Sequence, residues 1–162
     1  MTRARLQLLV ILALILTACA NSPASGDAET ATSTPDPCLS ENMNETVQPI
    51  NDLQREFDDA SELAANLPRE QLQPLISDMQ RIRRAAEDQV VAACLVTLKT
   101  VQLAHMNAVI DTLLAFVSGA DVNELNQGMA EARNQYDLYT FEMARLLGVT
   151  LVPATETATA VP

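Results

Sequence analysis

The chain has 162 residues, no tryptophan, 3% aromatic residues and a net charge of −11. A surface with this excess of carboxylates repels phosphate backbones, so we expect no nucleic-acid partner. Glycine is scarce, while Ala, Leu, Gln and Glu recur, a composition that favours helices over sheets. About 110 residues remain once the polar ends are set aside, enough for one all-α domain with a single core.

Residues 1–18 have the pattern of an export signal. Arg3 and Arg5 precede an almost unbroken apolar run from Leu6 to Leu16, and small residues follow it. That order is typical of a signal peptide, and the run is too short for a comfortable transmembrane helix. We therefore predict a signal peptide over 1–18, and its removal takes away two positive charges and leaves a charge of −13.

The segment Leu16-Thr17-Ala18-Cys19 resembles the lipobox of bacterial lipoproteins. In that family the cysteine thiol receives diacylglycerol and the leader is cut directly before it, so the resemblance implies lipidation of Cys19. Two or more acyl chains hold a protein durably on a lipid bilayer. The resemblance covers the leader alone, and it implies an extracytoplasmic protein on the outer face of the plasma membrane or on an outer membrane.

Polar segments without apolar periodicity follow the lipobox and end the chain. Residues 19–37 are rich in Asn, Ser, Thr and Pro, and residues 150–162 are rich in Thr, Ala and Pro. Such segments bury too little apolar surface to offset the entropy lost on ordering. We predict a flexible tether over 19–37 with an average reach of about 20 to 25 Å, a helical bundle over 38–149 and a disordered tail over 150–162.

Four segments between these ends have apolar residues at steps of three and four. The first stripe runs from Val47 to Leu67 and includes Leu63, and the second runs from Leu72 to Val90. Pro74 is tolerated because it lies near the first turn of the second helix. These two segments predict an antiparallel hairpin.

The third segment, Val90 to Val117, is apolar nearly all round, with Lys99, His105 and Asp111 as its ionisable residues. We expect a helix surrounded by the others and the most buried of the four. A membrane span would be equally hydrophobic, but five polar side chains at regular intervals make insertion costly.

The fourth segment begins after the break at Gly119, where Asp121 and Glu124 have the form of a capping box, and Gly148 is predicted to cap its carboxyl end. Its apolar residues follow a coiled-coil-like seam, which leaves a homo-oligomer open. The seam consists of Val122, Leu125, Met129, Ala132, Tyr136, Tyr139, Met143 and Leu146.

The second and third segments have no strong helix breaker between Glu87 and Cys94. A turn there would give an antiparallel bundle of about four helices, whereas one continuous rod of about 70 Å would be shared by two offset hairpins. The apolar surface after Val90 favours the bundle, because a rod would expose more of it.

Cys38 and Cys94 remain once Cys19 is assigned to lipid, and outside the cytoplasm such a pair most simply forms a disulfide. The helices would rise about 40 Å from Cys38 to Leu67 and return about 36 Å to Cys94, so both cysteines reach the same level. The bridge would stabilise the fold by about 4 kcal/mol. Neither a Cys-x-x-Cys spacing nor basic neighbours indicate a redox-active pair.

His105 and Met106 are the candidates for lining a ligand site inside the bundle. The alternative is a buried, hydrogen-bonded histidine. A di-iron bundle needs Glu-x-x-His pairs, whereas the residue three before His105 is Gln102. We therefore predict no metal and no cofactor.

Catalytic motifs are also missing from the sequence. His105 is the single histidine, no Gly-x-Ser-x-Gly or Ser-x-x-Lys motif is present, and phosphate-binding glycine loops are absent. We expect a non-enzymatic lipoprotein, held on the bilayer through acylated Cys19, whose bundle docks another envelope protein or serves a structural role. The alternative is binding of a small apolar ligand, a metal or haem.

Overall fold

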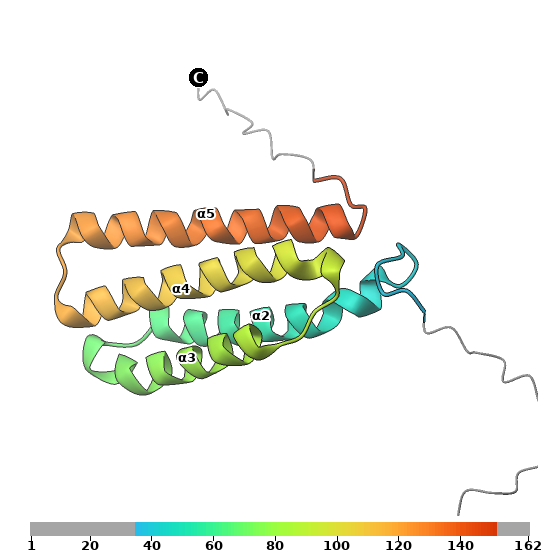
Figure 1. Cartoon of the computed structure of the whole chain (residues 1–162). Coiled ribbons are helices and arrows are strands. Elements are labelled where there is room, and N and C mark those ends of the chain that lie inside the picture. Colours follow the sequence, from blue (N-terminus) through green and yellow to red (C-terminus); the bar gives the residue numbers. More distant parts are fainter. Residues whose placement is uncertain (1–34, 152–162) are drawn as a thin grey trace, which may run out of the picture. The chain divides into compact units, whose positions relative to one another are not determined.

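The computed structural model describes residues 35–151, so the predicted signal peptide, Cys19 and most of the predicted tether and tail lie outside the described residues. Within that range the chain forms four α-helices and no β-strand, which confirms the predicted all-α class (Figure 1). The helices are α2 (Met43–Ala65), α3 (Leu72–Asp88), α4 (Val96–Ser118) and α5 (Val122–Leu146), and two short 3-10 turns, η1 (Arg69–Gln71) and η2 (Ala93–Leu95), lie between them.

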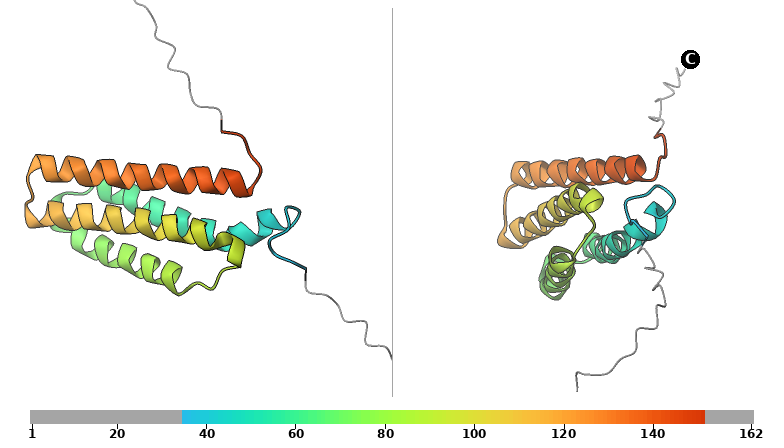
Figure 2. Two further views of the ribbon diagram at one scale, coloured as in Figure 1. Left: turned by 45° about the horizontal axis from the view of Figure 1, so that its top comes forward. Right: turned by 45° about the vertical axis from the view of Figure 1, so that its right-hand side comes forward.

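The four helices form an antiparallel bundle in which α4 is the central element. Successive helices run in opposite directions, and α4 packs against α2, α3 and α5. Helices α2 and α3 also pack against each other, whereas the extensive packing of α5 is with α4. Figure 2 shows α4 lying between α5 and the α2–α3 hairpin.

The break between α3 and α4 decides between the two predicted topologies. Helix α3 ends at Asp88, and the backbone is extended at Gln89 before η2 begins. The Lys99 ammonium donates to the carbonyl oxygens of Glu87 at 2.7 Å and Gln89 at 2.5 Å, and so satisfies the carboxyl end of α3. The molecule is therefore a four-helix bundle. Our assignment of Val90 to an apolar stripe was wrong, because in this extended segment its side chain is 97% exposed.

Cys38 and Cys94 form the predicted disulfide, with their Cα atoms 5.8 Å apart. Cys38 lies in the turn before α2, and Cys94 lies in η2, directly before α4. The bond therefore closes the open end of the α2–α3 hairpin and fixes the start of α4 to the start of α2.

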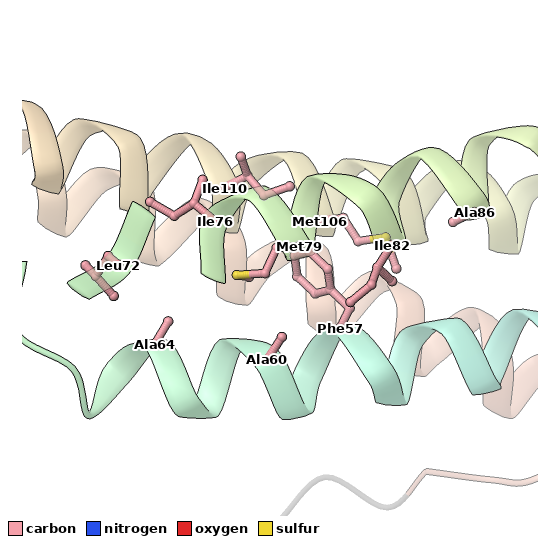
Figure 3. Packing of buried hydrophobic residues seen from close by; sticks show 10 residues of the cluster. All are labelled: Phe57, Ala60, Ala64, Leu72, Ile76, Met79, Ile82, Ala86, Met106 and Ile110. Carbon is pink, nitrogen blue, oxygen red and sulfur yellow. The ribbon is translucent and has the colours of Figure 1, made fainter. Parts of the chain in front are cut away.

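The main core cluster lies between α2, α3 and α4. Figure 3 shows Phe57 of α2 pointing toward Met79 and Ile82 of α3, with Met106 and Ile110 contributed by α4. A second cluster, nearer the disulfide, joins the start of α2 and the start of α4 to Tyr139 of α5. The first cluster contains no residue of α5, so the main core is formed by three helices.

One sequence expectation about burial is confirmed and one needs correction. Six of the 23 residues of α4 are exposed, against 11 of 23 in α2, so α4 is the least exposed helix, although it has five buried residues and α2 has seven. Most of the other residues of α4 are half-buried, because three neighbours each cover a different strip of it. Leu63, assigned to the stripe of α2, is exposed because no helix covers that side of the end of α2.

The helix caps of α5 agree with the sequence. Asp121 Oδ1 accepts hydrogen bonds from the backbone amides of Asn123 at 2.8 Å and Glu124 at 3.0 Å. Gly119 and Gly148 follow α4 and α5 with φ values of 85° and 67°, left-handed conformations that favour glycine.

The stretch Ala93–Ser118 is long and apolar enough to cross a membrane by length and composition. The core helix of a soluble bundle meets the same test, so this evidence is weak. Two of its polar side chains bind protein groups instead: Gln102 Nε2 donates to Ile50 O at 2.8 Å, and Lys99 holds the end of α3.

Candidate functional site

Helices α2, α4 and α5 meet at a polar junction centred on His105, which is 7% exposed. Its Nδ1 lies 3.0 Å from Ala132 O, and since a carbonyl oxygen only accepts, Nδ1 carries the proton. Its Nε2 lies 3.6 Å from Asp58 Oδ1, too far for a hydrogen bond. The junction therefore joins α4 to α5 directly and places a carboxylate of α2 beside the imidazole.

Aromatic rings pack around the imidazole. Phe57 meets it edge-on, with centroids 5.9 Å apart, and Tyr136 lies at 5.1 Å. Burial raises the pKa of Tyr139 far above the usual tyrosine range, and the nearby carboxylate of Asp58 adds to that rise. The Tyr139 hydroxyl is buried and has no hydrogen-bond partner among the described residues.

The structure separates the two residues predicted to line a ligand site. His105 faces the polar junction, whereas Met106 is fully buried in the main core cluster beside Phe57 and Ile82 (Figure 3). In residues 35–151, no group of three or more His, Cys, Asp or Glu side chains is arranged to hold a metal ion. The imidazole is thus a buried, hydrogen-bonded histidine, the alternative considered from the sequence.

Sequence reasoning missed an open apolar groove of about 530 Å³ between the second half of α2, the second half of α4 and the first half of α5. The sequence of no single segment predicts this groove, because three helices form its walls. The lining includes Ser61 and Ala65 from α2, Leu113 and Phe116 from α4, and Met129 and Arg133 from α5.

The polar junction borders the end of the groove nearer the disulfide. Asp58 precedes Ser61 by three residues in α2, and Tyr136 follows Ala132 by four in α5, so each lies one helical turn beyond a lining residue. Because α2 and α5 run in opposite directions, both steps lead toward the same end of the bundle. The groove therefore has the polar junction at one end and the α4–α5 turn toward the other.

Helix α5 carries an apolar line that the bundle does not cover, which we call the outer seam: Val122, Met129 and Tyr136. These side chains recur every seven residues and are 71%, 54% and 42% exposed. The alternate positions of the predicted seam, Ala132 and Tyr139, are buried. A heptad pattern is typical of a helix that packs against other helices, and here the bundle covers half of it.

No family model, no curated protein and no solved structure matches the chain. Among residues 35–151, the imidazole of His105 is hydrogen-bonded to the carbonyl oxygen of Ala132, and its Nε2 faces the carboxylate of Asp58.

Proposed function

We propose that the chain is an extracytoplasmic lipoprotein, anchored through acylated Cys19, whose helical domain is a non-catalytic docking module for another envelope protein. The outer seam of α5 is the observation that carries this proposal. Three large apolar side chains at heptad spacing are suited to a further helix, so the partner contributes a helix to the bundle.

The position of the outer seam supports docking. The described chain enters and leaves the bundle at the disulfide end, whereas α5 begins at the opposite end (Figure 1). A helix seated on Val122 and Met129 therefore lies toward the end of the bundle opposite Pro35 and Leu151, the first and last described residues.

The charge of the chain favours a different protein over a second copy. Each chain carries a net charge of −11, and two such surfaces repel each other when brought into contact. A partner with a more basic surface avoids this repulsion. The homo-oligomer left open by the seam is thus the second choice.

Site-specific photocrosslinking tests the docking surface. The full chain would carry a photoreactive phenylalanine analogue at Val122 or Met129, and a matched control would carry it at exposed Arg84 on α3. We expect one discrete crosslinked product from the α5 positions, identified by mass spectrometry as another envelope protein, and none from Arg84. A product made of two copies of this chain would replace the proposal with self-association, and absence of any α5-specific product would refute docking.

A separate experiment tests the anchor. Wild-type chain should fractionate with membranes and yield an amino-terminal peptide whose mass includes acyl chains on Cys19. Cys19→Ser should release the protein from membranes, whereas Cys38→Ser, the control, should leave it anchored. Membrane retention of Cys19→Ser would contradict the lipid anchor.

A further inference from the structure

We infer that the groove between α2, α4 and α5 is a binding site for a small amphipathic monocarboxylate. Its aliphatic tail lies along the apolar floor, and its carboxylate lies between Ser61 and Arg133. This site goes beyond the proposed docking function, since it takes a small molecule, and it shares Met129 with the outer seam.

The floor of the groove provides the apolar part of the site. Leu113 and Phe116 of α4 and Met129 of α5 line it, and none of the three is fully buried by the rest of the protein. Its volume of about 530 Å³ lies within the range of small-molecule sites. The lining of α4 from Val109 to Phe116 spans two helical turns, about 10 Å, which suits a short aliphatic chain.

Ser61 and Arg133 provide the polar end. They line the groove from α2 and α5, and they lie about one helical turn from Asp58 and Tyr136 of the polar junction. Neither side chain has a hydrogen-bond or ion-pair partner among residues 35–151, whereas the hydroxyl of Thr112 in the same groove donates to Ala108 O at 2.7 Å. Two donors without an acceptor at one end of an apolar groove favour an anionic head group.

The charges around the groove are compatible with an anion at this end. Arg133 is the one charged side chain among the described lining residues, and no carboxylate in residues 35–151 lies within ion-pair distance of it. The nearest acidic residue of α2 toward the junction, Asp58, accepts a hydrogen bond from Gln54 Nε2 at 2.8 Å and faces His105. Asp58 is therefore part of the polar junction, beside His105.

The α4–α5 wall of the groove is held by a close helix contact. A Cβ atom at Gly128 would lie 3.2 Å from Thr112 Cβ and closer still to Thr112 Oγ1, so glycine permits this approach. The polar junction holds α5 one turn beyond the groove. A site held on both sides is preformed, which lowers the entropic cost of binding.

Equilibrium dialysis of the full chain carrying Cys19→Ser tests this site with decanoate, decanol and decylamine as probes. We expect decanoate to bind more tightly than decylamine. Arg133→Gln should weaken the binding of decanoate about tenfold or more and leave the binding of decanol nearly unchanged. The reason is that Arg133 contacts only a charged head group, which decanol lacks. Arg84→Gln, which removes the same charge from the exposed face of α3, should leave decanoate binding unchanged.

Ala65→Phe is a second test variant. The larger side chain fills the groove from an exposed position of α2, so it should abolish the binding of both decanoate and decanol. Circular dichroism would verify that each variant melts as wild type does. The proposal is overturned if wild type does not bind decanoate, if Arg84→Gln weakens binding as much as Arg133→Gln does, or if Ala65→Phe binds normally.

Discussion

The α2–α3 hairpin and helix α5 show how differently two parts of one small bundle use an apolar pattern. In the hairpin, the stripe of α3 is almost wholly buried, and Leu72, Ile76, Met79 and Ile82 are each at most 1% exposed. In α5 the pattern is at least as regular, yet Val122, Met129 and Tyr136 remain in contact with solvent. The hairpin is also closed by a disulfide, whereas α5 is held mainly by α4.

Apolar periodicity therefore specifies which side of a helix is apolar, but it does not specify how many neighbouring helices cover that side. Helix α3 has two neighbours that converge on one stripe. Helix α5 has one main neighbour for a stripe wide enough for two, so half of its seam remains available. The uncovered half is where we place the docking partner, and the groove beside it is where we place the ligand.

The largest expected effect comes from opening the hairpin. Replacing Cys38 and Cys94 with serine should lower the free energy of unfolding by about 4 kcal/mol, because the unfolded chain regains the entropy of a long open loop. Urea denaturation of both proteins under oxidising conditions measures this. Adding a reductant to wild type should reproduce the loss, and a difference below about 1 kcal/mol would show that packing alone holds the hairpin.

A matched pair of methionines compares the two regions directly. Met79→Ala in the hairpin core should cost about 2 to 5 kcal/mol, since it leaves a cavity among residues that cannot collapse. Met129→Ala in the outer seam should change the free energy of unfolding by less than about 0.5 kcal/mol. Chemical denaturation checks both, and similar losses at the two positions would mean that α5 is as tightly packed as the hairpin.

Gly128→Ala should separate α5 from α4 without disturbing the hairpin. The new methyl group would press against Thr112, and we expect a loss of about 1 to 3 kcal/mol. Hydrogen exchange by mass spectrometry should show faster exchange in α5 and unchanged protection in α3. Equal acceleration in both helices would contradict the view that α5 is a separately held element.

The last comparison is at the second core cluster, to which α5 contributes Tyr139. Its hydroxyl is buried without a partner among the described residues, so Tyr139→Phe should be neutral or slightly stabilising, within about 1 kcal/mol. The melting temperature of Tyr139→Phe should be compared with that of Tyr136→Phe, because Tyr136 has a more exposed side chain. A marked loss of stability in Tyr139→Phe would mean that the hydroxyl has a partner, such as an ordered water.

Much of the fold could be predicted from local signals in the sequence. Asp121 caps α5 through its own side chain, and the glycines after α4 and α5 adopt the left-handed conformation that few other residues accept. The pairing of Cys38 with Cys94 follows from two helices of similar length in a hairpin. Each of these features depends on neighbouring residues or on simple geometry.

The candidate site could not be predicted in the same way. The sequence directs attention to His105 and Met106, which are neighbours in the chain but face different clusters. Ser61 and Arg133 carry no local motif, and they are significant because α2 and α5 place them across one groove. Lys99 likewise ends α3 by binding carbonyl groups that lie ten and twelve residues earlier.

Local patterns in the sequence were enough to establish that this protein is helical, where its helices begin and end to within a few residues except at the α3–α4 boundary, and which cysteines pair. Hydrogen bonding and apolar spacing within one segment are enough for those outcomes. The tertiary structure alone decided that α3 and α4 are separate, that half of the α5 seam stays uncovered and that a groove forms beside it. These depend on how much of each helix its neighbours bury, a property of the packed bundle and not of any one segment.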